Sequence, residues 1–307
     1  FTVLRNFVTV MRRPHIVTIC AVVGLPLSFL FNYIFMYGNW GAPAMGAMAV
    51  GLSGSLVAVV HLVLIVAYVE WVPQLRHYRI FADLLRLDRK TMKELFHVGV
   101  PIALSYLFES GLFFFSAALM GIISTAALAG HNAVINICSV SFMIPYAFSQ
   151  AATVRVGYSI GAGRLEAARM AGYVAIGLGL AWMMLAALTM WIAPELLIAV
   201  YLDRGDPLNA EAVRMAASFF MVAAIFQVVD GLQVTTQGAL RGLKDTKVPM
   251  IICGLGYWVF GLGTGVPLAF WFGLGGIGLW WGMAIGLLVS GTLLLLRWRH
   301  MSARLIA

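Results

Sequence analysis

Residues 98–123 read VGVPIALSYLFESGLFFFSAALMGII, a run of 26 residues in which Glu109 carries the one charged side chain. A transmembrane helix needs about 20 predominantly apolar residues, so this run predicts a helix that crosses a bilayer. Glu109 lies near the middle of the run, where a carboxylate costs roughly 2.5–3.5 kcal/mol on insertion scales. A cost of that size indicates that the side chain faces something other than lipid.

The rest of the chain has the same apolar character. It is 62% hydrophobic and 10% charged, whereas a soluble domain has roughly 25% charged residues. Because lipid forces every backbone group to pair within the protein, long apolar runs of this kind predict helices and not a barrel. We therefore expect an all-α polytopic membrane protein with eight visible spans, at residues 14–37, 43–69, 98–123, 126–152, 168–193, 212–239, 246–271 and 274–297.

Positive charge is distributed unevenly between the connections. Of the 20 Lys and Arg residues, 18 fall in alternate connections, and the intervening connections contain only Arg204 and Arg214. Positive charge marks the cytoplasmic side of a membrane protein. We therefore expect a multi-pass protein of the cell inner (cytoplasmic) membrane with a cytoplasmic C-terminus. On this interpretation the formal charge of +8 sets the orientation in the lipid bilayer and does not indicate nucleic-acid binding.

Two segments of the chain resemble each other without a gap at a separation of 235 residues. YGNWGAPAMGAMAVG at 37–51 aligns with FGLGGIGLWWGMAIG at 272–286, and eleven of 42 positions are identical when residues 14–55 are compared at this offset. Repeats that run in the same direction are related by an axis along the membrane normal, as in the two halves of many transporters. Four other spans precede the second copy, which predicts four further helices before the first copy and twelve in all.

This repeat divides the chain into three expected parts. Residues 1–70 are expected to form the last two helices of a first six-helix lobe, and residues 98–307 the whole second lobe. The missing N-terminal helices would then be a partner of this chain within the same protein. Between the lobes, residues 71–97 interleave leucines with basic residues, which predicts an amphipathic cytoplasmic linker. A plain solvated connector is the alternative.

Glu109 and Asp230 are the two acidic residues that lie inside predicted spans. Polar side chains recur at helical spacing around both of them and along the fourth span, so three helices each present a polar face. Three polar faces in one six-helix unit predict a shared cavity, and the alternative is that they serve only as hydrogen bonds between helices. The residues expected to line the cavity, aromatic neighbours included, are Tyr106, Phe113, Asn132, Asn136, Ser139, Tyr146, Phe226, Gln227, Gln233 and Gln237.

The charge of this expected cavity favours cations. No Lys or Arg lies in the middle of a predicted span, so Coulomb attraction and contact with aromatic faces would both draw a cation in. A carboxylate removed from water is stabilised by binding a proton. A small ion such as Na⁺ could instead use Glu109 and Asp230 as metal ligands, together with the glutamine oxygens.

Three cysteines, Cys20, Cys138 and Cys253, stand singly inside predicted spans. Their spacing matches no metal-binding pattern, and they are expected to be packed and inert. The sequence therefore predicts no cofactor beyond the H⁺ or Na⁺ that Glu109 and Asp230 would bind.

Three stretches resemble one known family: GVPIALSYLFESGLFF (99–114), AATVRVGYSIGAG (151–163) and FQVVDGLQVTTQGALRGLKDTKVP (226–249). They are similar to the multidrug and toxic compound extrusion (MATE) transporters, in the NorM-like branch. The resemblance covers essentially the whole chain, and the surroundings of Glu109 and Asp230 are its most specific parts. It implies a twelve-helix antiporter, present here from about the fifth helix onward, that exports organic cation drugs in exchange for H⁺ or Na⁺.

The resemblance also implies roles for individual residues. The acidic residues that match Glu109 and Asp230 bind the coupling cation in this family. Phe226 stands where some members have a Tyr, so a hydroxyl ligand is absent at that position.

Two other functions remain open on the sequence. A lipid-linked sugar flippase of related architecture would carry an anionic cargo and need Arg or Lys at depth, which the missing helices could supply. An intramembrane hydrolase could use Glu109 and Asp230 as an acid–base pair, although the sequence has no H-E-x-x-H, G-x-S-x-G or phosphate-loop motif. The expectation is a secondary active transporter and not an enzyme.

Overall fold

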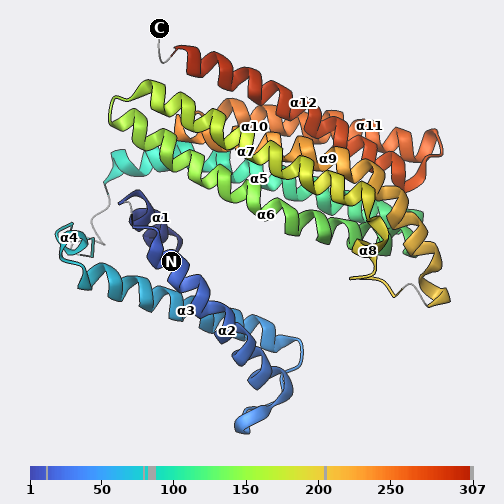
Figure 1. Cartoon of the computed structure of the whole chain (residues 1–307), viewed down its shortest axis with the longest axis horizontal. Helices are drawn as coiled ribbons and strands as arrows, with labels where there is room; N and C mark the ends of the chain where they lie inside the picture. The colour runs from blue at the N-terminus through green and yellow to red at the C-terminus, as the bar shows by residue number, and fades with distance from the viewer. Residues whose placement is uncertain (12, 79, 82–87, 204–205, 305–307) are drawn as a thin grey trace. The chain divides into compact units, whose positions relative to one another are not determined.

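The computed structural model describes residues 1–307 except 12, 79, 82–87, 204–205 and 305–307. These described residues form helices and no strands, and eight of the helices are long and apolar enough to cross a membrane. The predicted all-α class with eight spans is therefore confirmed. The chain divides into two units, Phe1–Arg89 and Lys90–Ala307 (Figure 1).

The smaller unit is built on a pair of long helices. Its elements are α1 (Thr2–Val10), α2 (His15–Tyr37), the 3₁₀ turn η1 (Asn39–Gly41), α3 (Met48–Trp71) and α4 (Pro73–Arg76). A small apolar core of Leu4, Val8, Ile16, Cys20, Ile65, Val69 and Leu75 holds them together. The predicted linker at 71–97 falls partly on residues 79 and 82–87, which lie outside the described residues.

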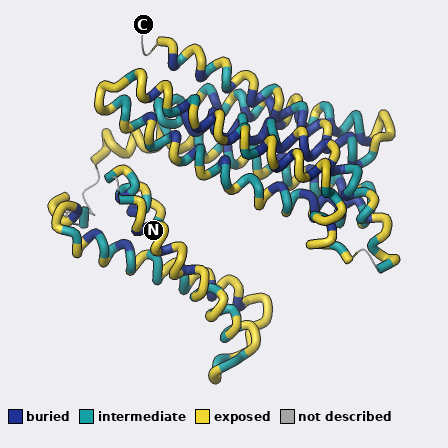
Figure 2. Tube along the Cα trace, viewed as in Figure 1, coloured by how far each residue is buried: buried dark blue, intermediate teal, exposed yellow. Residues whose placement is uncertain are grey.

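Over its described residues, the larger unit contains five long helices, a sixth span at Lys247–Trp271 that is built from four consecutive segments, and two short segments. In order they are α5 (Arg89–Ile123), α6 (Thr125–Gly161), α7 (Leu165–Ile192), α8 (Pro194–Ile198), η2 (Pro207–Asn209), α9 (Ala210–Gly242), α10 (Lys247–Gly254), the π-helical η3 (Leu255–Leu262), α11 (Gly263–Val266), the π-helical η4 (Pro267–Trp271) and α12 (Gly275–Arg304). Helix α9 is buried along most of its length and packs against α6, α7 and α12. Figure 2 shows the buried residues concentrated in the interior of this bundle.

Helices α5 and α6 are longer than the predicted spans 98–123 and 126–152. Helix α5 begins at Arg89, inside the predicted linker, and α6 continues to Gly161. Hydropathy marks only the part of a helix that lies in hydrocarbon, whereas the backbone hydrogen bonds continue into polar sequence. Between the two helices Ser124 begins α6, because its hydroxyl accepts a hydrogen bond from the Ala127 amide at 3.0 Å.

Helices in the larger unit approach one another in two different ways. Glycines bring α12 against the preceding segments so closely that a Cβ at Gly282 would lie 2.3 Å from Gly265 Cα. Helix α5 has few close backbone contacts and meets its neighbours through large side chains, as where Phe115 packs 5.3 Å from Trp258. Because large side chains hold α5 away from its neighbours, space remains beside it.

The two hairpins of the predicted repeat begin with the same backbone conformation, although their connections differ in length. Gly38 and Gly273, 235 residues apart, have φ of 72° and 71°. Two residues further on, Trp40 has φ of 58° and Gly275 has φ of 56°. A left-handed conformation is rare for a residue as large as Trp, so its recurrence at the equivalent position supports the repeat.

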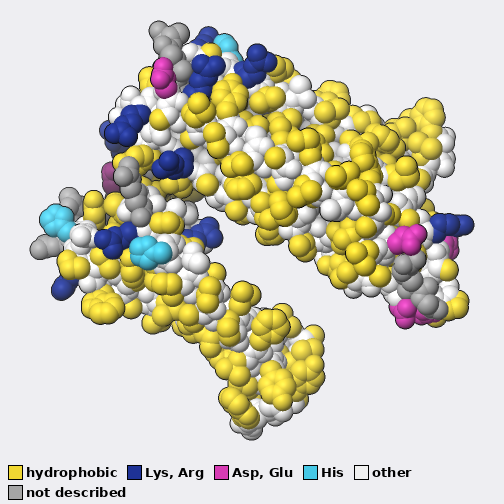
Figure 3. Space-filling view, viewed as in Figure 1, with side chains coloured by type: hydrophobic (Ala, Val, Ile, Leu, Met, Phe, Trp, Pro, Cys, Tyr) yellow, Lys and Arg dark blue, Asp and Glu magenta, His cyan; other side chains and the backbone are white. Residues whose placement is uncertain are grey.

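Charged side chains separate to the two ends of the larger unit. Lys and Arg gather at the end where α9 and α12 finish and α7 starts (Figure 3). Two ion pairs tie this end together: Lys244 Nζ to Glu94 Oε1 at 2.6 Å and Arg297 Nε to Asp245 Oδ2 at 2.9 Å. The alternation of charge along the sequence thus becomes a separation in space.

The close glycine packing of α12 gives a test of the fold. We expect Gly282→Val to lower the apparent melting temperature of the purified protein, because its side chain meets backbone atoms of Gly261 and Gly265 that cannot rotate away. Overpacking of this kind costs about 1–3 kcal/mol. The control is Gly177→Val in α7, where an added Cβ meets nothing within 4 Å. Equal melting temperatures for the two variants would contradict the packing described here.

Candidate functional site

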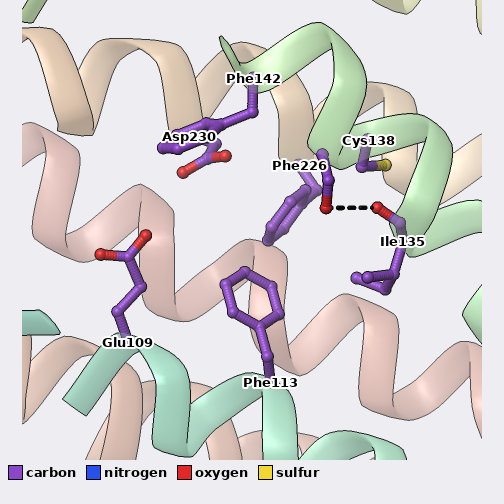
Figure 4. Close-up of a pocket in the computed structure, with 8 residues that line it drawn as sticks. Glu109, Phe113, Ile135, Cys138, Phe142, Phe226 and Asp230 are labelled. Atoms are coloured by element: carbon purple, nitrogen blue, oxygen red, sulfur yellow. Dashed lines mark hydrogen bonds between the residues drawn. The ribbon is translucent and has the colours of Figure 1, made fainter. Parts of the chain in front are cut away.

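One cavity in the larger unit contains both carboxylates that the sequence singled out. Its volume is about 80 Å³. It lies between α5, α6 and α9, the third, fourth and sixth spans of the sequence. Figure 4 shows the two carboxylates extending from α5 and α9 into the same space. The lining residues are Glu109, Phe113, Ile135, Cys138, Ser139, Phe142, Phe226 and Asp230.

Helical spacing explains why these residues meet. Each helix supplies pairs four residues apart, such as Glu109 with Phe113 on α5 and Phe226 with Asp230 on α9, and residues at that spacing share a face. The Phe113 and Phe226 rings pack edge to face with centroids 6.1 Å apart. Phe226 also packs at 5.6 Å against the fully buried Trp280. These contacts fix an aromatic wall beside the carboxylates.

The two carboxylates have no positive partner in the cavity. Asp230 is 5% exposed and Glu109 is partly buried. Among the residues that the structure describes, none forms an ion pair with either carboxylate. Two negative charges that share a small, mostly apolar space disfavour their doubly ionised state. A proton or a small cation would relieve that repulsion.

The size of the cavity limits what can bind there. Pockets for drug-sized ligands have volumes of about 300–1,000 Å³, and a water molecule takes about 30 Å³ of liquid. A space of about 80 Å³ accommodates a proton or a small ion with a few waters. It is too small for an organic drug.

The three glutamines of α9 lie outside the lining of this cavity and are buried between helices. Gln227 donates from Nε2 to the Cys138 carbonyl at 3.2 Å and to the Ser141 hydroxyl, which joins α9 to α6. Gln233 and Gln237 both direct Nε2 at Cys253 Sγ, at 3.5 and 3.6 Å. For these residues the alternative of interhelical hydrogen bonds describes the structure better than cavity lining does.

Arg241 brings a positive charge closer to the site than hydropathy indicated. It lies in the last turn of α9 and donates from Nη1 to Tyr106 Oη at 2.8 Å and from Nη2 to Gln237 Oε1 at 2.9 Å. Its guanidinium carbon is 4.7 Å from the centroid of the Tyr106 ring. Tyr106 therefore links α5 to α9 on the side of the basic end, one helical turn from Glu109, and does not line the cavity.

The polar face of α6 extends beyond the cavity. Asn132, Asn136 and Ser139 are all exposed, and Asn136 Nδ2 donates to the Asn132 carbonyl at 2.7 Å. Of these three, Ser139 lines the cavity. Further along the helix, the partly buried Tyr146 packs at 6.0 Å against Phe142.

Of the predicted lining residues, Phe113, Ser139 and Phe226 join the two carboxylates in the cavity. Sequence reasoning missed Ile135, Cys138 and Phe142, which are apolar or weakly polar. For Ile135 and Phe142 the available signal was their spacing of one helical turn from Ser139, and Cys138 precedes Ser139 directly. Cys20, Cys138 and Cys253 are all free and buried. Among the described residues, no group of three or more His, Cys, Asp or Glu residues is placed to hold a metal ion.

The link between Arg241 and Tyr106 can be measured through stability. We expect Arg241→Gln to lower the apparent melting temperature more than Tyr106→Phe, because it leaves both the Tyr106 hydroxyl and the buried Gln237 oxygen without a donor. A buried polar group without a partner costs about 1–3 kcal/mol, against about 0.5–1.5 kcal/mol for a typical hydrogen bond.

Arg299→Gln, at an exposed position of α12, is the matched loss of charge and should leave the melting temperature unchanged. In the double variant Arg241→Gln/Tyr106→Phe the two losses should not add, since both residues share one interaction. Fully additive losses would show that the two side chains do not interact.

Comparison with known proteins places this chain in a family. The MatE family model matches residues 101–270. The chain is 43% identical over 298 residues to a probable multidrug resistance protein NorM of Mesorhizobium japonicum, and 42% identical over 289 residues to the multidrug resistance protein NorM of Burkholderia vietnamiensis. These alignments cover 97% and 94% of the chain but 64% and 62% of the relatives. The chain thus spans less than two thirds of their length.

The fold is also shared with a solved transporter. The chain is similar to the crystal structure of the eukaryotic MATE transporter AtDTX14, with a TM-score of 0.82 at 22% sequence identity. The similarity covers 98% of this chain and 66% of that one. At this identity the likeness bears on the fold, whereas the sequence match bears on the family. The chain belongs to the MatE family.

Proposed function

We propose that this chain acts in a cation-coupled multidrug antiporter, which exports organic cations in exchange for H⁺ or Na⁺. Glu109 and Asp230 form the site of the coupling cation in this proposal. The observation that carries it is one small cavity that contains both carboxylates, without an ion-pair partner for either among the described residues. The NorM relatives, whose names describe multidrug resistance, support the drug as the exported substrate.

Coupling follows from electrostatics. When the cavity holds no cation, the two negative charges attract a positively charged drug toward this part of the protein. When a proton or Na⁺ binds, that attraction is lost and the drug is released. By linkage the drug weakens cation binding by the same factor as the cation weakens drug binding.

The drug itself needs more space than the carboxylate cavity provides. The exposed polar face formed by Asn132, Asn136 and Ser139 adjoins that cavity. Exposed amide groups are costly in hydrocarbon even where one of their hydrogen bonds is made within the helix, so this face is better suited to a wet space than to lipid. We assign it to the wall of a wider drug-binding space.

The distribution of charge supports an orientation for the protein. The end of the larger unit that gathers Lys and Arg (Figure 3) is assigned to the cytoplasm by the positive-inside rule. Helix α12 ends there, so the C-terminus is cytoplasmic in this proposal and the protein resides in the inner membrane. An anionic cargo such as a lipid-linked sugar would meet two unneutralised carboxylates in the cavity, which disfavours a flippase.

Transport by carboxylate variants tests the proposal. We expect Glu109→Gln and Asp230→Asn, each made in the full-length gene product, to reduce gradient-driven ethidium export from proteoliposomes to the rate of empty vesicles. Each change keeps the shape of the side chain but removes the charge that the coupling cation neutralises. Imposing pH and Na⁺ gradients separately then identifies the ion.

The matched control is Glu211→Gln, which removes the same charge from an exposed position at the other end of α9. It should transport at the normal rate. Normal export by either cavity variant under the gradient that drives the unmodified protein would overturn the assignment of the coupling site.

A further inference from the structure

A groove separate from the carboxylate cavity runs between α6 and α7 near the basic end. Its volume is about 420 Å³, and its lining consists of nine apolar side chains and Arg155. Five of the apolar residues are alanines, whose small side chains leave the space between the two helices open. The floor is well covered, since Ala152 and Ala175 are 2% and 7% exposed.

The outer wall of the groove has the character of a lipid-facing surface. Met170, Val174 and Leu178 lie four residues apart on α7 and are 65%, 49% and 49% exposed. Helix α7 is one of the eight helices long and apolar enough to cross a membrane. Hydrocarbon is therefore the natural neighbour of this face.

Arg155 gives the groove one polar end. It is exposed, and among the described residues no acidic side chain is within ion-pair distance of it. At the start of α7, Arg164 and Arg169 add positive charge and Glu166 subtracts one. Nearby acids at this end are already paired, Asp245 with Arg297 and Glu94 with Lys244. A net positive charge therefore remains available at the mouth of the groove.

A second groove, between the same two helices and the segment at 197–201, provides a contrast. It lies toward their other end, has a volume of about 440 Å³, and is lined by residues such as Ile144, Trp182 and Leu185 without any charged side chain. The two grooves are alike in size and apolar character. Of the two, the groove at Arg155 has a guanidinium group. A purely hydrocarbon ligand would not require one.

We propose that the groove at Arg155 binds an anionic phospholipid, with an acyl chain along the alanines and the phosphate on the guanidinium. Basic pockets between transmembrane helices are suited to acidic lipid head groups, and Arg matches the geometry of phosphate oxygens. Arg155 would repel a cationic drug. The ligand of this groove therefore differs in charge from the proposed transport substrate. The inference requires only that the chain spans a membrane.

Native mass spectrometry of the purified, delipidated full-length gene product tests this site. Phosphatidylglycerol and phosphatidylcholine are titrated separately and the bound lipids are counted. We expect one phosphatidylglycerol to bind more tightly than phosphatidylcholine. Arg155→Gln should weaken phosphatidylglycerol binding about fivefold, the effect of one basic side chain near an anionic head group, and leave phosphatidylcholine binding unchanged.

Two further variants separate the tail from the head group. Ala171→Phe fills the groove without altering charge and should weaken the binding of both lipids. Arg299→Gln removes a charge at the same end of the bundle but outside the groove, and should change neither affinity. The proposal is wrong if Arg155→Gln behaves like Arg299→Gln, if phosphatidylcholine binds as tightly as phosphatidylglycerol, or if Ala171→Phe leaves phosphatidylglycerol binding intact.

Discussion

The cost of holding two carboxylates away from bulk water governs this structure. Each costs roughly 2.5–3.5 kcal/mol at the centre of a bilayer, and placing Glu109 and Asp230 around one cavity of about 80 Å³ adds their mutual repulsion. No ion pair among the described residues offsets that cost. A proton or a small cation bound in the cavity would offset that cost, and a cavity of this volume would not accommodate an organic cation. The proposed coupling role follows from this restriction.

The site lies between a closely packed helix and one that meets its neighbours through side chains. Helix α9, which supplies Asp230, is buried among α6, α7 and α12, while α5, which supplies Glu109, meets its neighbours through aromatic side chains such as Phe113 and Phe115. Glu109 therefore stands on a helix with few close backbone contacts, and Asp230 on a helix buried among its neighbours.

Much of the candidate site was predictable from the sequence, because the cost of a charge in an apolar helix depends on its local surroundings. A carboxylate inside an apolar run is costly wherever the run lies, so Glu109 and Asp230 could be identified without coordinates, and helical spacing added Phe113 and Phe226. Spacing shows which residues share a face of a helix, but not which other helix that face contacts. Gln227 was therefore predicted to line the cavity, whereas its amide donates to the Cys138 carbonyl. Arg241 was missed because a long side chain can act a full turn away from its own Cα, and hydropathy records only where the residue stands in the sequence.

The central claim is that one cation bound by Glu109 and Asp230 competes with the drug. The most direct measurement is the equilibrium affinity of the purified full-length gene product for ethidium, across a range of pH and of Na⁺ concentration. The account predicts that affinity falls as the coupling cation rises, and that Glu109→Gln/Asp230→Asn binds ethidium weakly at every cation concentration. A double variant that keeps the cation dependence of the unmodified protein would contradict it.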